Sequence, residues 1–80
     1  MTTTVRFFAA AAEAAGTNTT QVDAETLGGL QAALLDAHGP EFERVLARCS
    51  TLVDGVRTED PATPLGPCVG VEILPPFAGG

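Results

Sequence analysis

One amphipathic helix in the middle of the sequence constrains the fold more than any other feature. Apolar residues recur from Leu27 at spacings of three and four, at positions 27, 30, 34 and 37. This spacing lines one face of a helix with side chains that must pack against something. Thr26 stands at the N-cap position, and Gly39 followed by Pro40 ends the pattern. The sequence therefore predicts a helix from about residue 27 to residue 38 that packs on a second layer.

Weaker helical signals flank this segment. Residues 9–15 are nearly all alanine, the best helix former, and Gly16 follows as a C-cap candidate. Residues 41–48 place three apolar side chains at helical spacing. Gly28 and Gly29 count against the main helix, because each costs up to about 1 kcal/mol relative to alanine in a helix interior.

Short segments with the strand pattern surround the helices. The segments predicted as strands are 3–8, 19–23, 50–53 and 69–74, with a further one beginning at Val56. Asp54-Gly55 is a two-residue hairpin signal between Val53 and Val56. Residues 58–68 contain three prolines and are predicted to form a loop.

The order of these elements predicts a small α+β fold in a single domain over residues 1–80. Hairpins place several strands in one sheet, and one amphipathic helix covers one of its faces. A chain of this length buries roughly 60% of its unfolded surface, which leaves little room for an internal active site. Function is therefore expected on a surface or at a chain end, and a flexible C-terminal tail is expected over about residues 76–80.

The charge of the chain narrows the class of partner. Ten acidic and four basic residues give a net charge of −6, which disfavours nucleic acid and anionic membranes as partners. An attraction to basic proteins and a simple role in solubility explain this charge equally well. No signal peptide or membrane-spanning stretch is recognisable, so a cytoplasmic protein with reduced thiols is expected.

The residues that usually carry chemistry form no convincing cluster. His38 is the sole histidine, and its position at a helix end favours a structural role. Cys49 and Cys68 lack the spacing of metal ligands, and buried free thiols are favoured over a disulfide. The Gly28-Gly29 pair is not followed by the lysine of a phosphate-binding loop. No metal or bound cofactor is therefore expected.

The C-terminal residues are the best candidate site. The last predicted strand runs into Pro75-Pro76, and Gly79-Gly80 ends the sequence. Prolines hold the exit extended, and glycines lack the side chains that would block entry into a narrow passage. Extended, residues 76–80 reach roughly 17 Å. These properties suit a carboxylate that is delivered into another protein, although a frayed terminus has the same composition.

Several segments together resemble the MoaD/ThiS family of ubiquitin-like sulfur carriers, most closely the small subunits of molybdopterin synthases. The similar segments are Phe7-Phe8-Ala9 with Glu13 and Gly16, residues 26–39, residues 52–55, Leu65, and residues 71–80. The resemblance covers nearly the whole chain. Three departures from the family pattern are visible: Ala12 replaces a frequent arginine, Gly66-Pro67-Cys68 replaces the usual turn, and Phe77 replaces a smaller valine.

The resemblance implies a ubiquitin-like β-grasp fold, a mixed sheet with one main helix packed on one face. It implies that a ubiquitin-activating-type adenylyltransferase uses ATP to adenylate Gly80, that Gly79 gives access, and that a sulfur donor forms a thiocarboxylate. The tail would then enter the large synthase subunit and donate sulfur for molybdopterin, so that catalysis belongs to the partners. The residues expected to contact partners are Phe7, Leu74, Pro75, Pro76, Phe77 and Ala78.

Three alternatives remain open from the sequence. The chain could carry sulfur for thiamine, cysteine or a secondary metabolite. It could be a protein modifier that is attached to lysines through Gly80. It could also be an interaction domain without chemistry at its end.

Overall fold

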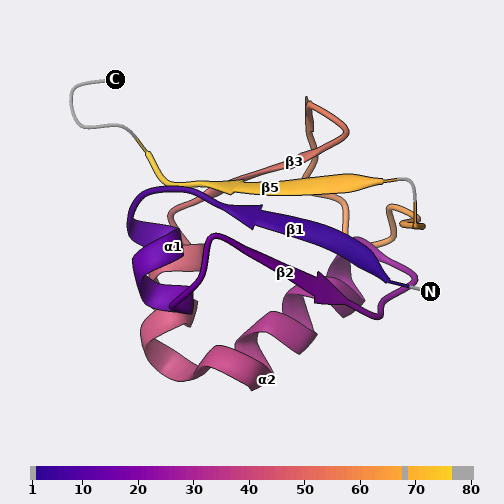
Figure 1. Cartoon of the computed structure of the whole chain (residues 1–80). Coiled ribbons are helices and arrows are strands. Elements are labelled where there is room, and N and C mark those ends of the chain that lie inside the picture. The colour runs from indigo at the N-terminus through magenta and orange to yellow at the C-terminus, as the bar shows by residue number, and fades with distance from the viewer. Residues whose placement is uncertain (1, 68, 77–80) are drawn as a thin grey trace.

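The computed structural model describes residues 2–67 and 69–76 of the chain and contains two helices and a five-stranded sheet (Figure 1). The elements in order are β1 (Thr3–Phe7), α1 (Ala10–Ala15), β2 (Thr19–Val22), α2 (Leu27–Leu46), β3 (Ser50–Val53), β4 (Val56–Arg57) and β5 (Gly70–Leu74). They agree closely with the predicted segments. Within the described residues, no helix is long and apolar enough to cross a bilayer.

The sheet is mixed, with the strand order β2-β1-β5-β3-β4. β1 and β5 are parallel, with Val5 opposite Val71, whereas β1–β2, β3–β5 and β3–β4 are antiparallel. The last strand of the sequence therefore lies at the centre of the sheet. This arrangement confirms the α+β prediction.

The core lies between the sheet and the helices, which cover the same face of the sheet (Figure 1). Alternate residues of the strands point into it, because side chains alternate across a pleated strand. The fully buried side chains include Thr3, Val5, Val71 and Ile73 from the sheet, Ala11 from α1, and Leu27, Leu30, Leu34 and Phe42 from α2. Among residues 2–67 and 69–76, no helix covers the opposite face, which is called the open face below.

α2 consists of two helical segments joined at Gly39. Thr26 is its N-cap, and the Thr26 hydroxyl accepts a hydrogen bond from the Gly29 amide (3.2 Å). Gly39 has φ 82° and ψ −168°, which is not helical, and Pro40 follows. The predicted end of the main helix at Gly39 is thus confirmed, and a second segment continues to Leu46.

The Gly39→Ala substitution is expected to lower the free energy of unfolding by about 1–3 kcal/mol, because this backbone conformation is nearly restricted to glycine. An added Cβ would meet no atom within 4 Å, so the loss would come from the backbone alone. Gly66→Ala is the matched control, since Gly66 also has open space and lacks a positive φ. Urea denaturation that gave equal stabilities for the two variants would contradict this account.

The predicted hairpin at Asp54-Gly55 is also confirmed. Both residues have positive φ, 51° and 82°, as the favoured two-residue turn requires. The Asp54 carboxylate accepts a hydrogen bond from the Gly70 amide (2.9 Å), and the Asp54 amide donates to the Gly70 carbonyl (2.8 Å). The turn therefore fixes the start of β5.

Candidate functional site

The central strand β5 is the base of the candidate site. It is hydrogen-bonded to β1 on one side and to β3 on the other, so neither of its edges is free. Beyond the end of β1, the Phe8 amide still donates to the Ile73 carbonyl (3.2 Å). Ser50 pairs with Leu74 on the other side. Since both neighbours hold the strand up to its last residue, the point where the chain leaves the sheet is fixed.

Two prolines mark the exit from the domain. Pro75 is buried and Pro76 is exposed, so the chain emerges from the body of the domain between them. The burial of Pro75 makes it an anchor for the end of β5, in contrast to its predicted role as a partner contact. Pro76 is placed as predicted for a contact residue. The remaining predicted site residues, Phe77, Ala78, Gly79 and Gly80, lie outside the described residues.

The structure corrects the prediction of an exposed Phe7. Its side chain is only 3% exposed and belongs to the core, where its ring meets that of Phe42 edge to face at 5.7 Å. The next residue, Phe8, is half-buried instead. Within the described residues, Phe8 is not among the partly buried side chains that pack against the core. Phe8 therefore replaces Phe7 as the aromatic residue available to partners.

The open face beside the exit combines apolar and charged side chains. Leu52, Glu72 and Leu74 are half-buried, and Arg6 is exposed. Arg6 opposes Glu72, and Glu72 opposes Leu52, so these three lie in one row across the strands. The Arg6 guanidinium lies over the Phe8 ring, 5.5 Å from its centroid, at the distance of a cation–π interaction. This surface is suited to a protein partner because it offers both contact area and charge.

The other titratable candidates are structural. His38 packs its ring 5.1 Å from that of Phe42 and 6.1 Å from that of Phe7, which confirms the structural interpretation. The Cys49 thiol donates to the Val45 carbonyl (3.1 Å), and burial raises the pKa of this thiol. A raised pKa lowers the fraction of reactive thiolate, so Cys49 is poorly suited to carry sulfur. Cys68 lies outside the described residues.

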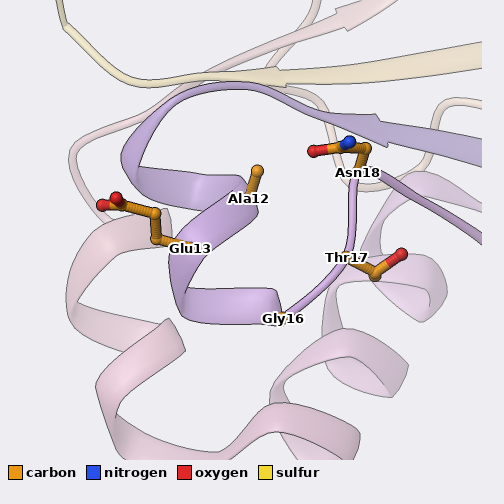
Figure 2. Close-up of a pocket in the computed structure, with 5 residues that line it drawn as sticks. All are labelled: Ala12, Glu13, Gly16, Thr17 and Asn18. Carbon is orange, nitrogen blue, oxygen red and sulfur yellow. The ribbon is translucent and has the colours of Figure 1, made fainter.

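A shallow hollow of about 370 Å³ beside α1 does not have the features of an active site. Figure 2 shows the Asn18 amide turned toward Ala12, whereas the Glu13 carboxylate points to the other side of α1. The Thr17 hydroxyl donates to the Thr19 carbonyl (2.9 Å). Polar groups thus do not converge on the hollow. In the described part of the chain, no cluster of three or more potential ligands could hold a metal ion.

The comparison with known families agrees with this geometry. The sequence profile of the ThiS family matches residues 5–80, almost the entire chain. The chain belongs to the ThiS family. Its five-stranded mixed sheet with a helix packed on one face is the ubiquitin-like β-grasp fold, as the resemblance implied. No curated protein sequence matches the chain significantly.

Solved structures of similar proteins cover the whole domain. SAMP1 from Haloferax volcanii is 27% identical, with a TM-score of 0.84 and complete coverage of both chains. A complex of subunits 1 and 2 of the molybdopterin-converting factor from Helicobacter pylori contains a chain that is 25% identical, with a TM-score of 0.78 and complete coverage of both chains. The small archaeal modifier protein 1 from Methanosarcina acetivorans is 25% identical, with a TM-score of 0.84, and the match covers 99% of this chain and 96% of that one. This ThiS-family member therefore has the fold of ubiquitin-like sulfur carriers.

Proposed function

We propose that this ThiS-family protein is a sulfur carrier whose Gly80 carboxylate is adenylated and then converted to a thiocarboxylate. The observation that carries the proposal is the placement of β5. This strand is held at the centre of the sheet and passes through buried Pro75 and exposed Pro76 into four further residues that end in Gly79-Gly80. Such a strand presents a narrow terminal segment on a rigid base.

The chemistry requires enzymes that act on this terminal segment. A carboxylate is a poor electrophile. An adenylyltransferase of the ubiquitin-activating type would therefore join the Gly80 carboxylate to the α-phosphate of ATP and release pyrophosphate. A sulfide-equivalent nucleophile would then attack the acyl carbon and displace AMP, which leaves the thiocarboxylate. This chain contributes the orientation of the reacting group, because a tethered nucleophile reacts at high effective concentration.

Molybdopterin biosynthesis is the pathway that we propose. The similar chain from Helicobacter pylori was solved in a complex of two subunits of a molybdopterin-converting factor. A corresponding large subunit would accept the tail of this chain and receive its sulfur. A second candidate is a protein modifier, favoured by the 27% identity to SAMP1 over the full length of both chains.

Deletion of Gly80 is expected to abolish thiocarboxylate formation while the domain stays folded, because the core that the structure describes is built from residues up to Ile73. The measurement is intact-protein mass spectrometry after incubation with ATP, the activating enzyme and a sulfide source. The full-length chain should gain the mass difference between one sulfur and one oxygen atom, and the deleted chain should not. The thermal unfolding of both proteins checks that the fold is retained.

The Gly66→Ala variant is the control, since it changes a glycine away from the tail at which an added Cβ would meet no atom within 4 Å. It should be loaded with sulfur like the full-length chain. Absence of any mass gain on the unmodified chain with its activating enzyme would overturn the sulfur-carrier proposal. Lysine-linked conjugates that disappear on Gly80 deletion, without any thiocarboxylate, would favour the modifier.

A further inference from the structure

The open face carries two opposite charges on adjacent strands, Arg6 and Glu72, which form no ion pair with each other among the described residues. Arg6 and Glu72 oppose each other on the adjacent strands β1 and β5, where opposite charges commonly pair across strands. Neither forms an ion pair within residues 2–67 and 69–76, where the salt bridge found is that of Arg57 with Glu59 (3.7 Å). Both charges are therefore available to a partner.

The Arg6 guanidinium is directed along the strand toward the exit of the tail. It lies over Phe8, which follows the end of β1, rather than against the neighbouring Glu72. A planar guanidinium that rests on an aromatic face keeps its N–H donors available at its edge. Phe8 thus holds the arginine in place and leaves the N–H donors accessible at the edge of the guanidinium.

The position of this arginine is informative because the chain as a whole is acidic. With a net charge of −6, the protein repels acidic surfaces in general. A single arginine beside the exit converts that repulsion into a local attraction for one carboxylate. A carboxylate on a protein surface fits better than a nucleotide or free phosphate, since three half-buried apolar side chains surround the charges and can be covered by apolar residues of a protein: Phe8, Leu52 and Leu74.

We infer that Arg6 is a specificity residue, which pairs with a carboxylate on the partner enzyme that receives the tail. The partner surface covers Phe8, Leu52 and Leu74 with apolar side chains and places an acidic residue against Arg6. Phe8 is the positioning residue for the guanidinium. This inference rests on the proposed function, because the partner is the large synthase subunit that would accept the tail, as in the two-subunit complex that contains the similar chain from Helicobacter pylori.

The test compares two charge reversals that have the same effect on net charge. Arg6→Glu changes the open face, whereas Arg44→Glu changes an exposed arginine on α2, which packs on the covered face of the sheet. Calorimetric titration would use the large synthase subunit encoded in the same genome as this chain. Arg6→Glu should raise the Kd for this subunit on the order of tenfold more than Arg44→Glu and should reduce the salt dependence of binding.

Two further measurements separate recognition from folding. Arg6→Glu should stay folded and lose only a few degrees of unfolding temperature, because the side chain is exposed and the new carboxylate opposes Glu72 at the surface. Reversal of the facing carboxylate on the partner to arginine should restore binding to Arg6→Glu. Equal weakening by Arg6→Glu and Arg44→Glu would overturn the inference. Such equal weakening would leave the proposed function intact as long as the wild-type chain still formed a thiocarboxylate on Gly80. Failure of the wild-type chain to form a thiocarboxylate would overturn the proposed function itself.

Discussion

Replacement of Phe42 by alanine is expected to lower the free energy of unfolding by about 3–5 kcal/mol. The Phe42 side chain has no exposed surface and lies in the second segment of α2. Its ring contacts that of Phe7 on β1 edge to face and also packs on His38. Truncation would leave a cavity and remove two aromatic contacts, each of which contributes beyond its buried area.

This loss is large for a domain of 80 residues. Native domains are stable by roughly 0.05–0.15 kcal/mol per residue, so the variant would lose a large part of the total. Phe42→Leu is the matched control, because it keeps an apolar side chain and should lose less than about 1.5 kcal/mol. Urea denaturation measures both. Equal stabilities of the alanine and leucine variants would show that the contacts of the Phe42 ring with the sheet do not stabilise the domain.

The features that the sequence predicted best depend on local backbone conformation. Gly16 adopts the left-handed conformation at the end of α1, as its place after the alanine run predicted. Asp54-Gly55 forms the expected turn, and Gly39 interrupts α2 where the pattern ends. Each of these residues specifies its own φ and ψ, so a short stretch of sequence contains the whole signal.

Local sequence information did not determine which of the two adjacent phenylalanines, Phe7 or Phe8, points into the core. Alternation indicates only that Phe7 and Phe8 lie on opposite faces of β1, and the packing of the helices decides which face is covered. A usable signal was nevertheless present. Val5 and Phe7 share one face and Arg6 and Phe8 the other, so the exposed arginine marks Phe8 as outward. Resemblance alone assigned a partner contact to Phe7, which the structure places in the core.

The central position of β5 could not be predicted from the sequence pattern. It depends on parallel pairing with β1, in which Thr4 meets Gly70 near the opposite end of the chain. Strand segments with the same alternation pair equally well in several orders, and only packing of the whole domain selects one. The tail was therefore recognisable as a candidate site, whereas the rigidity of its base became evident only in the structure.

Gly28 in the first turn of α2 is a second feature that local propensity described poorly. From the sequence alone, this glycine was expected to weaken the helix. In the structure, its backbone amide donates a hydrogen bond to the Pro61 carbonyl (2.9 Å). A Cβ at this position would lie 2.9 Å from the Pro61 Cβ and 3.2 Å from the Pro61 carbonyl oxygen. Leu27 also donates to the Thr63 carbonyl (2.9 Å), so the loop between β4 and β5 caps the start of α2. Glycine allows this close approach.

Substitution of alanine at positions 28 and 29 is therefore expected to have unequal effects. Gly28→Ala should lower the free energy of unfolding by about 1–3 kcal/mol, because the loop must move away from the helix. Gly29→Ala should leave stability within about 0.5 kcal/mol of wild type or raise it, since alanine favours the helix. The nearest atom to a Cβ there is the Thr26 hydroxyl oxygen at 3.3 Å.

Thermal and urea unfolding of the two variants measure this difference directly. Amide hydrogen exchange adds a second readout. The backbone amides at positions 27 and 28 donate to carbonyls of the loop, so Gly28→Ala should lower their protection against exchange. Gly29→Ala should leave that protection unchanged. If both variants gained stability, helix propensity would outweigh the contact with Pro61, and the loop would not be a fixed cap on α2.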